Sequence, residues 1–271
     1  MKIRFNLFLK SFLLSFVAFA LVACIIIASL YITAVSIEPE EDETTVLLGI
    51  YDQGKILSLT VINFDPSTST VSFLPIPDNT LLRSNVLLQT TYPNQEISVA
   101  IDGIEGIIGT SINRYLMLSV DALAHIVNEL GEFSCLIPHN LKFNYNGIHY
   151  SGPELNMNGD LAGAMFTYGG YDMKKVSISE IGLSFLYSFL SKFANSAYTY
   201  EMGELLTSKQ TLELIDTDLS DKEMLAYCSL ISRYSSYDTK ELKLSGTVHD
   251  EASSSIYFSP DTYNSDKNIF K

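Results

Sequence analysis

Residues 44–80, TTVLLGIYDQGKILSLTVINFDPSTSTVSFLPIPDNT, constrain the fold more than any other part of the chain. Segments 46–50, 56–64 and 70–74 are rich in β-branched and large apolar residues, and the turn-forming triplets DQG and DPS separate them. This pattern predicts three central strands. The second is apolar along nearly its whole length, which is typical of a strand covered by helices on both faces.

Helical patterns and strand-like segments alternate over the following residues, up to residue 260. A Ser177-x-x-Glu180 capping box predicts the start of a long core helix, and Ser220-x-x-Glu223 predicts the start of a later one. The apolar stripe of the long helix consists of Ile178, Ile181, Phe185, Leu186, Phe189, Leu190 and Phe193. Segments 241–248 and 254–258 are expected to close the sheet.

This alternation predicts the α/β class, a three-layer α/β/α domain with a central mixed sheet over residues 44–260. Residues 261–271 form a polar tail that is expected to fray.

The first forty residues predict a membrane anchor. Lys2, Arg4 and Lys10 precede an uncharged run over residues 11–37, which is long enough to cross about 30 Å of hydrocarbon as a helix. An acidic linker, residues 38–43, follows the run. Positive charge before the span and negative charge after it place residues 1–10 in the cytoplasm and the C-terminal domain outside the cell.

Two other interpretations of this segment remain open. A cleaved signal peptide normally has an apolar region of roughly 7 to 15 residues, and this run is longer. Leu21-Val22-Ala23-Cys24 has the form of a lipobox, in which Cys24 would be lipidated, although residues 25–32 stay mostly apolar. A membrane-spanning helix and a lipidated Cys24 both leave the domain extracytoplasmic.

Charge and cysteine content narrow the classes of partner. Without the three basic residues of the first ten, 14 Lys and Arg oppose 31 Asp and Glu, a net charge of −17. So acidic a domain excludes nucleic acid and close electrostatic adhesion to anionic lipid. Cys135 and Cys228 could pair in an oxidising compartment or stay buried as free thiols.

Common enzyme signatures are absent from the sequence. It contains no Gly-x-Ser-x-Gly elbow, Walker loop or His-Glu-x-x-His motif, and its four histidines share no metal-ligand spacing, so no metal site is predicted. Asp216, Asp218 and Asp221 cluster. They either bind a divalent cation or occupy the start of a helix, where the dipole favours acidic residues.

Several segments after the anchor carry a family resemblance through their order and spacing. They are LLGIYD (47–52), a strand ending in Phe64-Asp65-Pro66, VSFLPIPDNT (71–80), RYLMLSVDALAHIVNELG, Met157-Asn158-Gly159, the Asp172 segment with its helix, Thr217-Asp218-Leu219-Ser220, and LKLSGTVHD. Together, over about residues 45–260, they resemble the LytR-CpsA-Psr proteins of bacterial envelopes.

That resemblance implies a phosphotransferase that moves a glycopolymer from a polyprenyl pyrophosphate lipid to the cell wall. Such proteins hold the pyrophosphate and Mg²⁺ with arginines and carboxylates, because guanidinium pairs bidentately with phosphate and neutralises developing charge. This chain departs from the pattern. Where the family has Arg-Asp before Thr80, this chain has Asp78-Asn79. Residues 165–169 correspond to an arginine-rich stretch of the family but contain no arginine. Of the next family motif, only Asp172 and Lys175 remain.

The sequence therefore predicts a membrane-anchored, extracytoplasmic LytR-CpsA-Psr-like domain without transferase activity, which acts in envelope lipid or polymer binding, scaffolding or regulation. One alternative is an active transferase with a rebuilt site, for which Mg²⁺ is the implied cofactor. Another is an unrelated α/β surface domain. The candidate catalytic residues are Asp172 and Lys175, and the candidate ligand-binding residues are Asp52, Asn79, Arg83 and Lys174.

Overall fold

The computed structural model describes residues 43–93, 95–138, 141–171, 178–194, 197–233, 236–249, 256–261 and 268–270. The predicted anchor at 11–37 and the cytoplasmic segment 1–10 lie outside this part of the chain. Among the described residues, no helix combines the length and the apolar character that crossing a bilayer requires.

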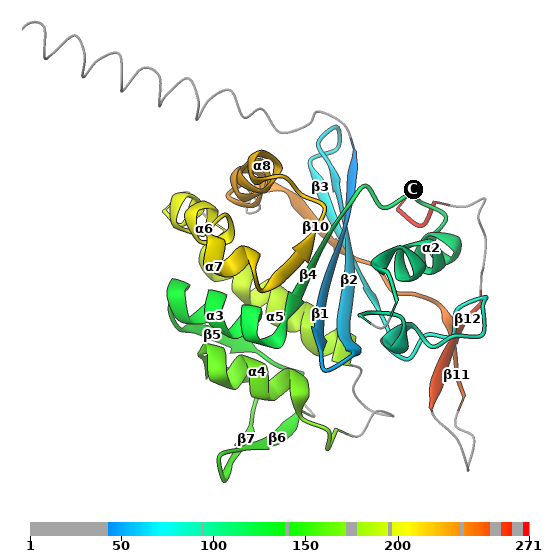
Figure 1. Ribbon diagram of the computed structural model, residues 1–271, viewed down its shortest axis with the longest axis horizontal. Helices are drawn as coiled ribbons and strands as arrows, with labels where there is room; N and C mark the ends of the chain where they lie inside the picture. Colours follow the sequence, from blue (N-terminus) through cyan, green and yellow to red (C-terminus); the bar gives the residue numbers. More distant parts are fainter. Residues whose placement is uncertain are drawn as a thin grey trace, which may run out of the picture. The chain divides into compact units, whose positions relative to one another are not determined.

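A six-stranded mixed sheet is the centre of the domain (Figure 1). Its strands, in spatial order, are β10 (Asp238–Glu241), β3 (Thr70–Ile76), β2 (Lys55–Asp65), β1 (Thr44–Asp52), β4 (Arg114–Ser119) and β9 (Ile215–Thr217). β2 runs antiparallel to both of its neighbours, whereas β4 is parallel to β1 and β10 is parallel to β3. The three predicted strands of residues 44–80 are confirmed, and β2 is buried along almost its whole length.

Helices cover both faces of the sheet, as the apolar character of β2 predicts. On one face, α2 (Ile97–Ile108) and the short 3₁₀ helix η1 (Leu88–Thr90) pack with Leu47, Leu59, Val61 and Leu74 in one hydrophobic cluster. The other face packs against α3 (Val120–Leu130), α4 (Gly159–Thr167), α5 (Ile178–Phe193), α6 (Thr199–Leu206) and α8 (Asp221–Ile231). The mixed α/β class is therefore confirmed.

Helix starts follow the side chains that the sequence offers as caps. The Ser119 hydroxyl accepts a hydrogen bond from the Ala122 amide at the start of α3, and Asn158 accepts one from Leu161 at the start of α4. The predicted Ser220/Glu223 capping box opens α8, with both of its hydrogen bonds present. The box predicted at Ser177 lies outside the described residues.

Three small sheets and one short helix complete the fold. β6 (Lys142–Tyr145) and β7 (Ile148–Ser151) form a hairpin, in which Asn146 and Gly147 take the positive φ angles of its tight turn. β5 (Phe133–Leu136) pairs with β8 (Glu154–Met157), and β11 (Gly246–His249) pairs with β12 (Tyr257–Pro260). α7 (Lys209–Leu212) leads into β9.

The prediction for the C-terminal strands is wrong in part. The edge strand of the main sheet is β10, whose four residues are all exposed, and residues 242–245 are not in a strand. β11 and β12 pair with each other instead of closing the main sheet. An exposed edge strand needs no apolar alternation, so the apolar residues at 241–248 predicted the wrong bounds for this strand.

Candidate functional site

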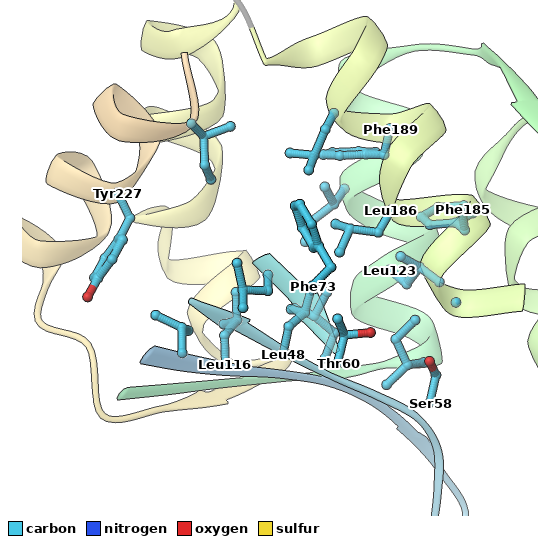
Figure 2. A pocket seen from close by; sticks show the side chains of 18 of the residues that line it. Leu48, Ser58, Thr60, Phe73, Leu116, Leu123, Phe185, Leu186, Phe189 and Tyr227 are labelled. Atoms are coloured by element: carbon cyan, nitrogen blue, oxygen red, sulfur yellow. The ribbon is translucent and has the colours of Figure 1, made fainter. Parts of the chain in front are cut away.

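An apolar cavity of about 180 Å³ lies between the sheet and the helices that cover the α5 side of it (Figure 2). Strand residues of one parity line it, because successive side chains of a strand point to opposite faces. The sheet contributes Val46, Leu48, Ile50, Ser58, Thr60, Ile62, Phe64, Phe73, Leu116 and Leu118. The helices and the segment before α8 contribute Leu123, Ile126, Gly182, Phe185, Leu186, Phe189, Leu190, Met202, Leu206, Leu219, Tyr227 and Ile231.

None of these lining side chains carries a charge. The polar side-chain groups among them are the hydroxyls of Ser58, Thr60 and Tyr227. An isolated anion buried against such a lining would lose its hydration without gaining a partner, so the cavity suits an apolar group. An engineered apolar cavity of about 150 Å³ in another protein binds benzene, so this cavity can take a small part of a hydrocarbon chain as it stands.

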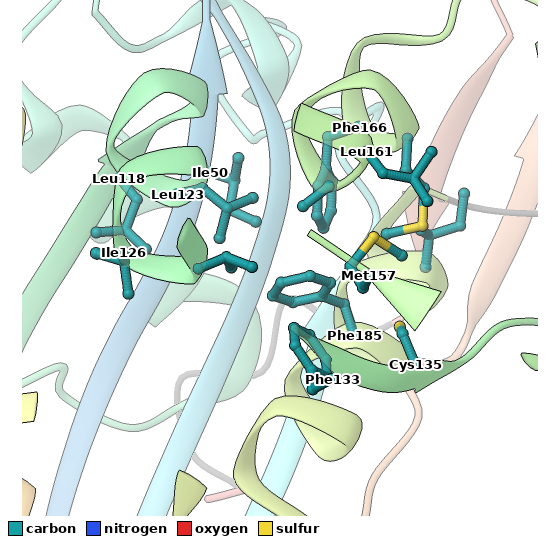
Figure 3. Packing of buried hydrophobic residues seen from close by; sticks show 14 of the residues in the cluster. Ile50, Leu118, Leu123, Ile126, Phe133, Cys135, Met157, Leu161, Phe166 and Phe185 are labelled. Carbon is teal, nitrogen blue, oxygen red and sulfur yellow. The ribbon is translucent and has the colours of Figure 1, made fainter. Parts of the chain in front are cut away.

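The long helix α5 contributes Phe185 and Phe189 to the lining, and its apolar stripe is only partly buried. Phe185 is buried, and its ring lies within a cluster that includes Phe133 and Phe166 (Figure 3). Leu186 and Phe189 were expected to be buried as well, but both are only half-buried. They line the cavity, so part of each side chain faces the space between helix and sheet.

Close contact between α5 and β2 occurs at Gly182. A Cβ atom at this position would overlap the Ser58 side chain, so a glycine is needed where the helix crosses the strand. The crossing places the Ser58 side chain at the cavity lining beside Gly182. Further along β2, Thr60 points to the same face as Ser58.

Two of the sequence-predicted ligand residues lie at one edge of the sheet. β1 and β3 both run antiparallel to β2, so Asp52 at the end of β1 and Asn79 after the end of β3 share an edge. The Asn79 amide donates to the Ile256 carbonyl oxygen at 3.2 Å, which ties the loop after β3 to the chain before β12. Arg83 follows in the same loop with an exposed side chain. None of the three lines the cavity.

Asp78 adds buried negative charge at this edge. Its side chain is only 5% exposed, and its Oδ1 atom has no hydrogen-bond partner. Burial raises the pKa of the Asp78 carboxyl to about 6, against smaller lowering effects of the Asp78 and Asn79 amides. A carboxylate here opposes the binding of a pyrophosphate.

The predicted catalytic residues cannot be placed in this geometry. Asp172, Lys174 and Lys175 lie outside the described residues. Arg114 begins β4, which is parallel to β1, so it lies at the opposite edge from Asp52. There its guanidinium pairs with Glu223 at 2.6 Å.

The aspartate cluster of the sequence is divided among separate structural contacts. Asp216 on β9 accepts hydrogen bonds from the hydroxyls of Tyr92, at 2.7 Å, and Tyr115, at 3.2 Å. Asp218 accepts one from the Tyr115 amide, and Asp221 lies in the first turn of α8. Within the described segments, no three His, Cys, Asp or Glu side chains are grouped so that they could hold a metal ion.

Both cysteines of the domain are buried free thiols. Desolvation raises the pKa of Cys135 to about 11 and that of Cys228 to about 12, so neither is a reactive thiolate at neutral pH.

The candidate site residues chosen from the sequence include none that is shown to line the cavity, and the hydroxyls that line it were missed. Ser58 and Thr60 alternate with Leu59 and Val61 along β2, so the period of two places both hydroxyls on one buried face. That signal was available in the sequence. The unfilled space above them was not, because it depends on how far α5, α6 and α8 lie from the sheet.

Comparison with known proteins finds a distant relative and several similar structures. No protein-family model matches the chain. The chain is 19% identical over 229 residues to "Polyisoprenyl-teichoic acid--peptidoglycan teichoic acid transferase TagV" of Bacillus subtilis (strain 168). The match covers 79% of this chain, and the chain spans only 58% of the length of that relative.

Solved structures share its architecture. The crystal structure of B. subtilis TagV superposes with a TM-score of 0.68 at 18% identity, covering 82% of this chain and 92% of that one. A structure described as "TagT bound to LIIa-WTA" gives a TM-score of 0.63 at 15% identity, covering 83% and 87%. The resemblance expected from the sequence is thereby confirmed at the level of architecture: the chain has the fold of the LytR-CpsA-Psr proteins.

Proposed function

We propose that this chain binds the apolar chain of an envelope lipid in the cavity between the sheet and α5, and that it does not transfer a polymer from that lipid. The observation that carries the proposal is the cavity lining, in which no side chain is charged. Such a lining stabilises hydrocarbon and leaves a charged head group in solvent.

The relatives support the class of ligand. TagV is named as a transferase of polyisoprenyl-linked teichoic acid, and structures of TagT are described as bound to LIIa-WTA and LI-WTA. Each buried CH₂ group contributes about 0.8 kcal/mol to binding. An isoprene unit has five carbons, so one unit supplies about 4 kcal/mol and a longer chain binds more tightly as far as the side chains let it enter.

The absence of transfer is proposed from the charges at the sheet edge. Pyrophosphate chemistry requires positive charge around the transferring group, but the buried Asp78 lies where the family has an arginine, and Thr167 and Gly169 are uncharged. Each missing charge-assisted contact costs about 2 to 4 kcal/mol of transition-state stabilisation. Losing three of them removes most of the acceleration of an enzyme.

The rival proposal is an active transferase whose site is rebuilt from Asp52, Arg83, Asp172, Lys174 and Lys175, with Mg²⁺ as the metal. It predicts catalysis that depends on Asp172 and Lys175, which the binding proposal does not.

Membrane attachment belongs to the same proposal. Residues 11–37 are proposed to span the membrane once, with residues 1–10 inside and the domain outside the cell. Phosphatase and fluorescent reporters fused in turn to the C-terminus test the orientation. The phosphatase, which is active only outside the cytoplasm, is expected to be active; a phosphatase without activity, beside a bright cytoplasmic reporter, reverses the assignment.

Photolabelling tests the ligand site. The full chain, reconstituted in lipid nanodiscs, is irradiated with a prenyl monophosphate that carries a diazirine in its tail, and labelled peptides are identified by mass spectrometry. Label is expected in β1, β2 and α5. Leu186→Trp, which fills the cavity, should abolish it, whereas Leu136→Trp, at a leucine that is 61% exposed on β5, should not. Equal labelling of both variants contradicts the proposal.

A further inference from the structure

Two hydroxyl groups inside the cavity are not explained by a purely hydrocarbon occupant. Ser58 is 4% exposed and Thr60 is 3% exposed, and both side chains line the cavity from the same face of β2 (Figure 2). Among the described residues, neither hydroxyl has a hydrogen-bond partner. Both positions could hold alanine or valine if the cavity served only hydrocarbon.

Buried polar groups in folded proteins are almost always hydrogen-bonded, and an unsatisfied one is costly. The two hydroxyls are adjacent positions on one face of a strand, about 7 Å apart along it at 3.3 Å per residue. A ligand oxygen beside either hydroxyl would satisfy its missing bond. The occupant should therefore carry a polar atom at this depth.

The chemistry of the surroundings limits what that atom can be. Ser58 packs against Gly182 of α5. The strand residues that line the cavity around Thr60 are apolar, apart from Ser58. With no cation in the lining, a phosphate or carboxylate beside these hydroxyls would be an unpaired buried charge. An uncharged oxygen meets no such penalty.

We infer that Ser58 and Thr60 determine specificity, by donating hydrogen bonds to an uncharged oxygen of a long-chain lipid, so that this site prefers a prenyl or other long-chain alcohol or its ester over the bare hydrocarbon. The inference rests on the proposed lipid-binding function. It adds to the apolar chain of the proposed ligand a neutral oxygen that lies within the cavity.

Competition against the photolabel tests this specificity in the nanodisc-bound full chain. Farnesol, farnesyl acetate, the matching fifteen-carbon hydrocarbon and farnesyl phosphate compete in turn for the wild type and for the Ser58→Ala/Thr60→Val variant, which keeps the cavity shape but removes both hydroxyls. Each competitor is compared with itself in the two proteins, because its partitioning into the bilayer then cancels.

In the variant, the binding of farnesol or farnesyl acetate is expected to be about tenfold weaker relative to that of the hydrocarbon. A tenfold change corresponds to about 1.4 kcal/mol, the size expected for a lost hydrogen bond. Farnesyl phosphate, whose charged end stays in solvent, should be unaffected. Ser72→Ala is the matched control. It removes a buried hydroxyl from the opposite face of the sheet and should change no ratio.

Each outcome has a separate meaning. If the double variant binds farnesol and farnesyl acetate as well, relative to the hydrocarbon, as the wild type does, the specificity inference is overturned. Protection of the wild type from labelling by any competitor would still support the lipid site. If no competitor protects the wild type from labelling, the proposed function itself fails. A tenfold loss that is equal for the phosphate and the alcohol would show that the double variant has damaged the cavity. The single variant Thr60→Ser, which keeps both hydroxyls, then decides. Wild-type binding of the alcohol by this variant would restore the inference, and a loss of binding would reject it.

Discussion

The two faces of the central sheet differ in how completely they are packed. Towards α2, Leu47, Leu59 and Leu74 are fully buried, and a Cβ atom on Gly49 would already overlap Met117 and Leu59. Towards α5, the same strands border a cavity of about 180 Å³. One face is therefore built for stability, and the other leaves space at the expense of packing, which is the arrangement expected of a binding site.

Truncation on the packed face should have the largest effect. Leu59→Ala removes a fully buried side chain of β2 from a region without spare volume, so it should lower the free energy of unfolding by about 3 to 5 kcal/mol. Urea unfolding followed by circular dichroism measures the loss. A loss below about 1 kcal/mol would mean that the α2 side is not the tightly packed face.

The second prediction concerns Asp78, which is the only charged side chain that is buried among the described residues. Its folded-state pKa of about 6 lies above the ordinary value of 3.8, so its contribution to stability is fully present below about pH 4 and is lost as pH rises through 6. The corresponding free energy is about 3 kcal/mol.

Asp78→Asn should therefore be more stable than the wild type at pH 7 by up to about 3 kcal/mol, with the difference vanishing near pH 4. Comparing the two proteins at each pH cancels the titration of the other carboxylates. A constant difference from pH 4 to pH 7, or a variant that is less stable at pH 7, would show that the Asp78 carboxyl has a partner when ionised.

Phe189→Ala should cost less than Leu59→Ala although it removes a larger side chain. Phe189 packs edge-on or tilted against Phe133 and Phe193, but part of its ring faces existing empty space. The expected loss is about 2 kcal/mol, below the usual range of about 3 to 5 kcal/mol for a buried phenylalanine. Measured beside Leu59→Ala, an equal or greater loss would show that the cavity face is packed as tightly as the other.

Sequence patterns predicted the elements better than the space between them. The apolar run of β2 and the Ser220/Glu223 box are local features, and both appear in the structure. The stripe of α5 predicted which side faces inwards. It could not distinguish side chains that fill a core from those that border a cavity, because both are apolar.

The sheet edge shows the same limit for long-range contacts. Asp78 lies in a loop that is held by residues far along the chain: the Phe258 amide donates to the Asn79 carbonyl oxygen, and the Leu81 amide donates to the Phe258 carbonyl oxygen. A turn-like sequence such as Pro77-Asp78-Asn79 predicts solvent exposure. The structure instead buries the carboxyl, in a loop that pairs with β12.

The most direct test of binding without transfer is turnover of a polyprenyl pyrophosphate-linked saccharide by the full chain in nanodiscs with Mg²⁺. Release of the polyprenyl product is followed by chromatography, with heat-denatured protein as the blank. We expect no release above the blank, while the same substrate protects β1, β2 and α5 from photolabelling. Mg²⁺-dependent release that Asp172→Ala or Lys175→Ala abolishes would contradict this account and establish the rebuilt transferase site instead.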